Sequence, residues 1–395
     1  MLNKIKNRCK GTSLQYSIFT NTSEIPANEW NVINEQHNLF LSLSYLRTLE
    51  NTLADTIDFR YVIFYRKDEA VGIAVNQLIK FNPQNLKLQE FPCRISDTIK
   101  NTLMKGMDVR VLICGNLFSC GEHGFVYSDK VTDREAFENL SEALKEIRKT
   151  EKADKPSFIL LKEFWPSSFT KSDYIKKQDF REFSIDVNMV LEVQRDWGSF
   201  DDYLASMKTK FRTRAKKVFK KSKELVVKDF TTDDVEIHKE IIDALYLSVL
   251  DKADFKIGKL NAITFKNLKE TLKDAFVFKG YFLEGSLVGF TTAFILNNIV
   301  EANHIGIDYS YNKSHDIYQR MLYDYVDLAI SRKVSELRLG RTAEIIKSSV
   351  GAKPVEMKLY ARHGNSLSNQ LIKPLIELIS PSEYEIRNPF KLQLG

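Results

Sequence analysis

The chain has 395 residues, of which 43% are hydrophobic and 28% are charged, with 16 glycines and 9 prolines. This composition is that of an ordinary globular protein and excludes the disordered, collagen-like and low-complexity classes. The 58 basic and 52 acidic residues give a net charge of +6, an excess too small to indicate a nucleic-acid-binding protein by itself. At about 150 residues per domain the length predicts two or three domains, and we take two as the working hypothesis.

The N-terminal segment and the cysteine pattern bear on where the protein works. Residues 1–10 are basic, but polar sequence follows them rather than an apolar stretch, so we expect no signal peptide. No stretch approaches the roughly 20 apolar residues of a membrane-spanning helix. We therefore expect a cytoplasmic protein whose contact with a membrane, if any, is peripheral and at the inner face. The 4 cysteines and 6 histidines lack the spacing of a zinc site, so we expect no metal.

Two segments far apart in the chain show the same pattern. Residues 60–81 and 276–296 each alternate apolar and polar residues, pass through a short turn, and resume after a Val-Gly pair. Each predicts a β-hairpin. Short apolar runs that end in glycine follow at 109–115 and 336–340. The repeated order predicts two copies of one fold, with a chance similarity of common hairpins as the alternative.

Helical patterns separate these strands. Residues 132–149 and 314–330 are predicted amphipathic helices, each with its first residue as the N-cap. Residues 159–161 form a strand candidate, and 183–193 form another that connects the two halves of the chain. Strands that alternate with helices and also include hairpins predict a mixed sheet.

Residues 199–225 predict a further amphipathic helix with an unusual charge. The stretch 207–223 contains nine basic residues and no acidic one. Like charges on one helix repel each other unless an anion lies nearby. We interpret the segment as a phosphate-contacting surface, with Lys210, Arg212 and Arg214 as candidate donor-binding residues. An anionic membrane, a tRNA or a phosphopantetheine carrier would each supply phosphate; the alternative is a solvated face that keeps the protein soluble.

The second half of the chain resembles the GNAT acyltransferase superfamily and, within it, the FemAB-like branch, in which two GNAT-like domains are fused. The resemblance rests on the order of a hairpin at 283–296, a strand at 300–308, the helix at 314–330 and the run 337–362, preceded by the basic segment 202–225. The first half resembles the family weakly, through the repeated pattern described above.

The resemblance implies a mixed α/β fold with two tandem GNAT-like domains, each a mostly antiparallel mixed sheet flanked by helices. We place the first domain at 12–182 and the second at 183–365, where it includes the basic helix 199–225. Residues 366–395 would form a C-terminal tail.

The resemblance also implies transfer of an acyl or aminoacyl group from an activated ester to an amine. A backbone amide of the strand Glu301–Asp308 would polarise the acyl carbonyl, and Gly306 on this strand is a candidate substrate-binding residue. The glycine-containing loop that cradles the pyrophosphate of coenzyme A in this family is missing, because 311–320 contains no glycine. This departure favours an acyl carrier protein or an aminoacyl-tRNA over acyl-CoA as the donor, and we expect no bound cofactor.

An amine attacks a thioester only when it is neutral, so the site needs a base. On a regular strand His304, Gly306 and Asp308 share one face, and Glu301 lies on the other. We predict His304 as the general base, with Asp308 and Glu301 as the next candidates and a hydrogen-bonded core histidine as the alternative. Tyr318 is the candidate general acid, with a packing role as its alternative.

Three more residues are candidates outside this strand. Arg341 and Lys347 follow the strand at 336–340 and could hold a carboxylate or phosphate of either substrate, unless they only solvate the surface. His123, in the glycine-rich segment 115–124, is a second acid/base candidate or simply a turn residue.

The leading functional hypothesis is an N-acyltransferase of bacterial lipid or cell-envelope biosynthesis that places an acyl group on an amine such as a long-chain amino lipid. The second is a FemAB-type peptidoglycan aminoacyltransferase that uses aminoacyl-tRNA. The third is a non-catalytic module that binds lipid or a cell-wall precursor, because a fold alone does not establish an activity.

Overall fold

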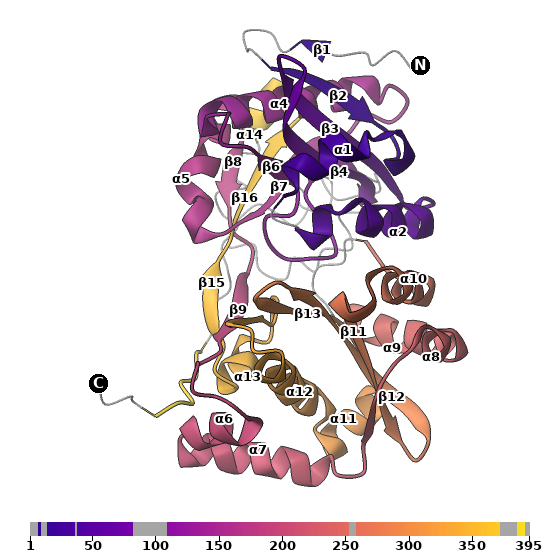
Figure 1. Ribbon diagram of the computed structural model, residues 1–395, viewed down its shortest axis with the longest axis vertical. Helices are drawn as coiled ribbons and strands as arrows, with labels where there is room; N and C mark the ends of the chain where they lie inside the picture. Colours follow the sequence, from indigo (N-terminus) through magenta and orange to yellow (C-terminus); the bar gives the residue numbers. More distant parts are fainter. Residues whose placement is uncertain are drawn as a thin grey trace. The chain divides into compact units, whose positions relative to one another are not determined.

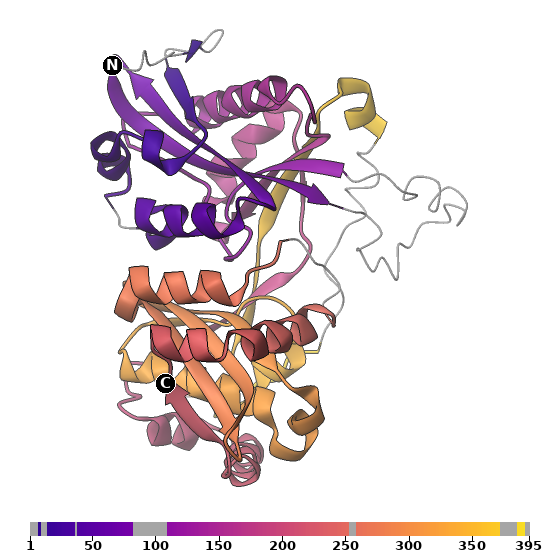
Figure 2. The same ribbon diagram turned by 90° about the vertical axis from the view of Figure 1, so that its right-hand side faces the viewer.

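Two separate β-sheets organise the chain in the computed structural model, and each has helices on both faces (Figures 1 and 2). The structure describes residues 7–8, 14–35, 38–81, 109–252, 258–371 and 385–391. The first unit comprises Met1–Ile185, Asp254–Lys259 and Glu356–Pro381, and the second comprises Asp186–Ala253, Leu260–Val355 and Ser382–Gly395. None of the helices in the described ranges has the length and apolar character that a bilayer-spanning helix needs.

The first sheet is mixed and mostly antiparallel. In spatial order its strands are β1 (Asn7–Arg8), β2 (Gln15–Phe19), β3 (Ile57–Arg66), β4 (Glu69–Phe81), β5 (Val109–Cys114), β7 (Phe158–Phe164), β16 (Lys358–His363) and β8 (Arg181–Phe183), with the short β6 (Phe125–Tyr127) beside β4. Helix α4 (Asp133–Thr150) packs on one face through a stripe of buried apolar residues. On the other face lie α1 (Ala27–Ile33) and α2 (Leu43–Leu53), and the short helices α5 (Phe169–Ser172) and α14 (Ser366–Leu371) complete the unit.

The second sheet has the order β10 (Val226–Asp229), β11 (Phe276–Leu283), β12 (Ser286–Leu296), β13 (Ile299–Ile307), β14 (Glu336–Arg338), β9 (Val187–Glu192) and β15 (Lys353–Glu356). Helices α8 (Thr232–Ile237), α9 (Lys239–Leu250) and α10 (Ala262–Leu272) cover one face (Figure 1). The other face carries α12 (Ile317–Ser331), against which α6 (Phe200–Ser206) and α7 (Thr209–Lys221) pack. The remaining helices are α11 (Tyr309–His315) and α13 (Glu344–Ser349).

The two sheets share one order of strands. In each, four consecutive antiparallel strands (β2–β5 and β10–β13) are followed by a strand that runs parallel to the last of them (β7 and β14), and a long helix makes the crossover. Both central hairpins close with two residues of positive φ: Lys67 and Asp68 at 47° and 69°, and Glu284 and Gly285 at 50° and 81°. This is the turn geometry that matches the twist of a tight hairpin. The predicted hairpins and the predicted duplication of one fold are confirmed.

The chain passes between the sheets twice. Strand β8 belongs to the first sheet and the next strand, β9, belongs to the second. The segment 183–193, predicted to connect the two halves, therefore does connect them. The second connection runs back from β15 to β16. Strand β16 pairs with both β7 and β8 in the first sheet, although the sequence analysis placed its residues in the second domain, 183–365. These pairings join residues 176 to 205 positions apart, from Leu359 with Phe183 to His363 with Phe158, which no local pattern encodes.

The predicted basic helix 199–225 is two helices rather than one. Met207 adopts extended backbone angles (φ −76°, ψ 149°) between α6 and α7 and forms a β-bridge with Phe390. The N–H of Lys208 donates to the carbonyl of Pro389 at 2.8 Å. The C-terminal segment therefore supplies partners for the backbone at the break, and the helical pattern on either side could not reveal it.

The helix predicted at 314–330 is also interrupted. Ser314 lies within α11, where its hydroxyl donates to the carbonyl of Tyr311 at 3.0 Å, so it is not an N-cap. Asp316 adopts a left-handed conformation (φ 50°) and α12 begins at Ile317. The predicted N-cap of this helix was therefore wrong by two residues, since the N-cap is Asp316.

A β-bulge interrupts β13. Thr291 pairs with Ile305 and Ala293 pairs with Ala302, so Asn303 and His304 together lie opposite the single residue Thr292. The hydroxyl of Thr292 accepts a hydrogen bond from the N–H of His304 at 2.9 Å and donates one to its carbonyl at 3.0 Å. One side chain thus satisfies the two backbone groups that the bulge removes from the regular ladder.

The bulge changes which side chains share a face. Val300 and Ala302 pack in the core against α12, and beyond the bulge Ile305 and Ile307 do the same. Because side chains alternate on either side of the bulge, Glu301 and His304 both lie on the opposite face, toward α9 and α10. The prediction that these two residues lie on different faces, made for a regular strand, was wrong.

Replacing Thr292 by Val keeps the shape of the side chain but removes the hydroxyl, leaving two backbone groups of His304 without their partner. We expect the free energy of unfolding to fall by about 1–3 kcal/mol. Thr292→Ser keeps the hydroxyl and is the matched control, with a smaller loss. Urea denaturation measures both, and equal losses in the two variants would show that the hydroxyl does not hold the bulge.

Candidate active site

Strand β13 separates from β14 after the first third of its length. The two strands pair in parallel only through Ile299–Glu301 and Glu336–Arg338, and β13 then continues along β12 alone. We call the point after Glu301 the fork. In the described part of the chain, no strand lies beside β13 on its β14 side beyond the fork.

Backbone groups of β13 point into this open edge. The N–H of Asp308 donates to the carbonyl of Val288 at 2.8 Å. In an antiparallel pair every second residue directs its backbone N–H and C=O toward the partner strand, so Gly306 and Asp308 do so toward β12. The backbone groups of Ile305 and Ile307 therefore point away from β12. The hydroxyl of Ser248 on α9 reaches the carbonyl of Ile307 at 2.6 Å, which agrees with this direction.

His304 lies among aromatic side chains of α9 and α10. The hydroxyl of Tyr246 is 3.2 Å from Nδ1 of His304, and the rings of Tyr246 and Phe265 lie 5.3 and 5.8 Å from the imidazole. The Nε2 atom is buried. Burial lowers the pKa of His304 to about 3, so the ring is neutral at neutral pH.

Tyr246 and His304 are both neutral at neutral pH. The Tyr246 hydroxyl lies within hydrogen-bond distance of Nδ1 of His304, and burial raises the pKa of Tyr246. A neutral imidazole of such low basicity takes few protons from an ammonium group at pH 7, so burial opposes the predicted role of His304 as general base.

Glu301 and Asp308 differ in their surroundings. Glu301 is 2% exposed and lies at the fork, beside Arg338 in the register of β13 and β14. Asp308 follows β13 and caps α11, where Oδ1 accepts from the N–H of Ser310 at 2.9 Å and from its hydroxyl at 2.6 Å. Capping of this kind is a structural role that uses the carboxylate.

Comparisons with known proteins bear on the fold. No family model and no curated protein sequence matches this chain. A crystal structure of FemX matches it with a TM-score of 0.54 at 12% identity, covering 86% of this chain and 98% of that one. A tandem GNAT protein from the clavulanic acid biosynthesis pathway matches with a TM-score of 0.55 at 8% identity, covering 89% of this chain and 99% of that one.

This chain has the double-GNAT, FemAB-like fold. The resemblance inferred from the order of motifs is thereby confirmed at the level of fold. We refer to the two units below as the first and second GNAT units.

The start of α12 lies where the resemblance places the loop that cradles coenzyme A. Here the N–H of Tyr318 donates to the side-chain oxygen of Asn312 at 2.9 Å. Lys221 of α7 donates to Asp316 and to the carbonyl of Lys313, each at 3.2 Å. Side chains of the protein thus occupy part of the helix terminus that a pyrophosphate would use.

Tyr318 packs between two hydrophobic clusters of the second GNAT unit. Burial raises the pKa of its hydroxyl, so the group keeps its proton at neutral pH. A hydroxyl in this state can donate a hydrogen bond but releases its proton reluctantly.

Lys347 supports the loop after β14. Its side chain is buried, and its ammonium group donates to the backbone carbonyl of Arg341. The neighbouring Thr342 and Ala343 have φ of 62° and 56°, a left-handed conformation that such residues rarely adopt. The structure therefore gives Lys347 a role in holding this loop, while its predicted contact with a substrate stays a prediction, as does that of Arg341.

The basic residues predicted to bind the donor lie on the other side of the sheet from His304. Lys210, Arg212 and Arg214 belong to α7, which packs against α12. Arg214 bonds the side chain of Gln319 on α12 at 3.2 Å. The structure does not bring these residues together with Glu301 and His304, because the sheet and α12 lie between them.

His123 holds a loop of the first GNAT unit. Its Nε2 lies 2.9 Å from the carbonyl of Cys120, and its Nδ1 lies 3.3 Å from the amide nitrogen of Asn38. The first contact requires a proton on Nε2 and the second an acceptor at Nδ1, which together fix a neutral ring. Buried Lys162 and Glu163 hold the same loop through the carbonyls of residues 116 and 119 and the N–H of residue 121.

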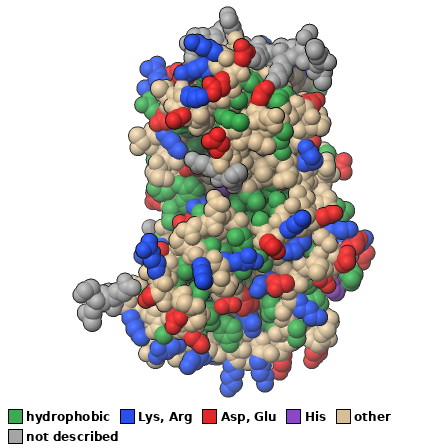
Figure 3. Space-filling model, viewed as in Figure 1, with side chains coloured by type: hydrophobic (Ala, Val, Ile, Leu, Met, Phe, Trp, Pro, Cys, Tyr) green, Lys and Arg blue, Asp and Glu red, His purple; other side chains and the backbone are tan. Residues whose placement is uncertain are grey.

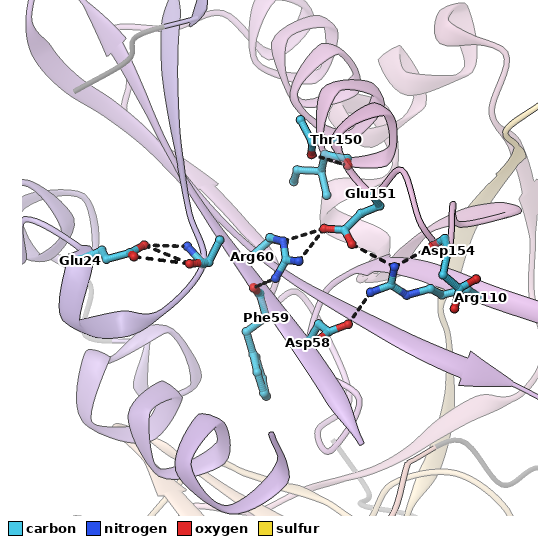
Figure 4. Close-up of polar contacts among 10 residues, drawn as sticks. Glu24, Asp58, Phe59, Arg60, Arg110, Thr150, Glu151 and Asp154 are labelled. Atoms are coloured by element: carbon cyan, nitrogen blue, oxygen red, sulfur yellow. Dashed lines mark hydrogen bonds and ion pairs between the residues drawn. The ribbon is translucent and has the colours of Figure 1, made fainter. Parts of the chain in front are cut away.

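Sequence reasoning missed a polar cavity in the first GNAT unit (Figure 4). Its volume is about 980 Å³, and its charged lining comes from the ends of β3, β4 and β5 and the end of α4. Glu151 accepts from Arg60 at 2.9 Å and from Arg110 at 2.9 Å, and Arg110 also bonds Asp58. Asp58, Arg60, Arg110 and Glu151 thus pair with one another, and these residues are too far apart in sequence to form a recognisable motif. Among the residues that the structure describes, no group of three metal-ligating side chains is placed to hold an ion.

Gly306 allows close packing between β12, β13 and α9. A Cβ atom there would lie 2.2 Å from the ring of Phe290 and 2.8 Å from Cβ of Leu245. We expect Gly306→Ala to lower the free energy of unfolding by about 1–3 kcal/mol through overpacking. Gly198→Ala is the control, since its Cβ would meet only a side-chain oxygen at 3.5 Å. An unchanged melting curve for Gly306→Ala would contradict the packing role.

The low pKa of His304 makes stability depend on pH. The pKa is 6.5 in the unfolded chain and about 3 in the folded protein, so the unfolded chain takes up the proton first as the pH falls. Stability is therefore lost as the pH drops from 6.5 toward 3. Between pH 7 and pH 5, the wild type should lose up to about 2 kcal/mol more than His304→Gln. Urea unfolding at both pH values measures the difference, and parallel losses would mean that His304 is protonated in the folded protein.

Proposed function

We propose that this protein is an N-acyltransferase that moves an acyl group from a thioester donor to an amine. The observation that carries the proposal is the fork in the second GNAT unit. The open edge of β13 offers backbone N–H groups, and the bulge places Glu301 and His304 on one face beside it. Backbone donors fixed in a sheet stabilise the negative charge that develops on a carbonyl oxygen under attack.

The proposed reaction needs one proton acceptor and one proton donor. The amine nitrogen attacks the thioester carbon, the C–N bond forms as the C–S bond breaks, and the amine proton finally resides on the departing thiol. We assign the proton acceptor to Glu301, because burial makes His304 a weak base. His304 would then act as a neutral side chain beside the reacting groups rather than as the base.

The proposed donor is an acyl group on a carrier protein. The side chain of Asn312 accepts a hydrogen bond from the N–H of Tyr318 at the start of α12, so this N–H is not available to a pyrophosphate. No glycine lies in 311–320 to allow close approach of a pyrophosphate. A carrier protein brings its own docking surface and depends less on such a cradle. The proposed acceptor is the amine of a long-chain lipid. The similarity in fold to FemX supports an aminoacyl-tRNA donor as the second candidate.

The test is amide formation measured by mass spectrometry with acyl carrier protein, acyl-CoA and aminoacyl-tRNA as alternative donors. We expect product from the carrier protein, and a loss of about 10²–10⁴-fold in kcat/KM for Glu301→Gln. Glu270→Gln, at an exposed position on α10, is the matched control and should retain activity.

Lipid analysis of the host with and without the gene tests the acceptor. Loss of an N-acylated lipid with accumulation of its free amine is the expected result. Product from aminoacyl-tRNA alone would replace the proposal by the second candidate. Full activity of Glu301→Gln would remove the assignment of the base.

A further inference from the structure

Helix α7 presents a row of lysines to solvent. Four exposed lysines lie on α7 and a fifth lies just after its end. In the described part of the chain none of the five forms an ion pair or a side-chain hydrogen bond: Lys210, Lys216, Lys217, Lys220 and, beyond α7, Lys223. Lys221 differs, since it pairs with Asp316 at 3.2 Å. Figure 3 shows Lys and Arg side chains gathered at the bottom of the picture, where Figure 1 draws α7. We call these five residues the lysine face.

The lysine face stands on a firmly packed helix. Ala215 and Val218 on the inner side of α7 are buried in the core with α12. The guanidinium of Arg320 lies 4.8 Å from the ring centre of Phe219 and bonds the hydroxyl of Ser222 at 3.3 Å. Packing therefore holds α7 in place although its charges repel each other. The positive charge is displayed on a fixed surface rather than on a loose tail.

The side-chain types distinguish a membrane from an RNA. The lysine face contains only lysines, whereas Arg212 and Arg214 are half-buried. The aromatic residues of the helix, Phe211 and Phe219, pack inward against the core. RNA is typically held by arginine forks and aromatic rings that stack on bases, and the lysine face offers neither. A lipid leaflet requires only point charges near its anionic headgroups.

We propose that the lysine face of α7 docks the protein on an anionic lipid leaflet. No large apolar side chain is exposed on α7, so the contact is electrostatic and does not involve insertion. The lysine face lies on the opposite side of the second sheet from Glu301 and His304. Docking is therefore a property separate from acyl transfer, and it can be measured without turnover.

Sedimentation with lipid vesicles tests the proposal on the full chain. The wild type should bind vesicles of phosphatidylcholine mixed with phosphatidylglycerol, and not vesicles of phosphatidylcholine alone. Binding should weaken as salt rises from about 50 to 300 mM, because added salt shortens the reach of surface charges. The triple variant K216Q/K217Q/K220Q should bind about 100-fold more weakly, at about fivefold for each lysine lost near an anionic surface.

A second triple variant controls for overall charge. K155Q/K259Q/K353Q removes the same number of exposed lysines outside α7 and should change binding less than fivefold. Melting curves establish that both variants fold. Amide formation on a water-soluble amine should be the same in the α7 variant and the wild type, so failure of docking and failure of catalysis are distinguishable.

Two results would overturn the proposal. One is wild-type binding that does not depend on phosphatidylglycerol, or that falls equally in the two triple variants. The other is binding to a tRNA transcript that is lost in the α7 variant while vesicles do not bind, which would assign the lysine face to RNA.

Discussion

The hydroxyl of Thr292 decides which side chains meet at the fork. By bonding both backbone groups of His304, it allows one extra residue in β13 without leaving those groups unsatisfied. The extra residue reverses the alternation of the strand, so that Glu301 and His304 share a face while apolar residues continue to face α12. In a regular strand, one of the two polar side chains would enter the apolar core, which is costly.

The two GNAT units use one strand order differently. In the second unit, β13 leaves β14 after three paired residues, and its open edge meets the hydroxyl of Ser248. In the first unit, β5 pairs with β7 along its last four residues. The loop that follows is held by His123, Lys162 and Glu163. Because buried charged groups hold this loop, it is difficult to displace from the end of β5. Of the two equivalent strands, β13 of the second unit is therefore the one whose edge is open.

Local signals predicted the elements, and long-range contacts set the details that matter for the site. The turn residues of both hairpins and the cap Thr132 of α4 are local, and these elements were predicted correctly. The break at Met207 depends on Phe390, and the bulge in β13 depends on Thr292 of the neighbouring strand. Periodicity within one segment carries no information on such partners. The regular alternation therefore placed Glu301 and His304 on different faces, which was wrong, while the catalytic roles of these residues stay predictions.

The two faces of the second sheet differ in whether their polar side chains are charged. On the side of α9 and α10, aromatic packing excludes water and keeps His304 neutral. On the other side, Asp324 of α12 pairs with Arg320 at 2.8 Å and accepts from Tyr281 at 2.9 Å, which anchors the arginine that packs on α7. Because this partly buried network and the apolar stripe hold the helix, its exposed lysines need no acidic neighbours for stability. Their charge remains available to an anionic surface outside the protein.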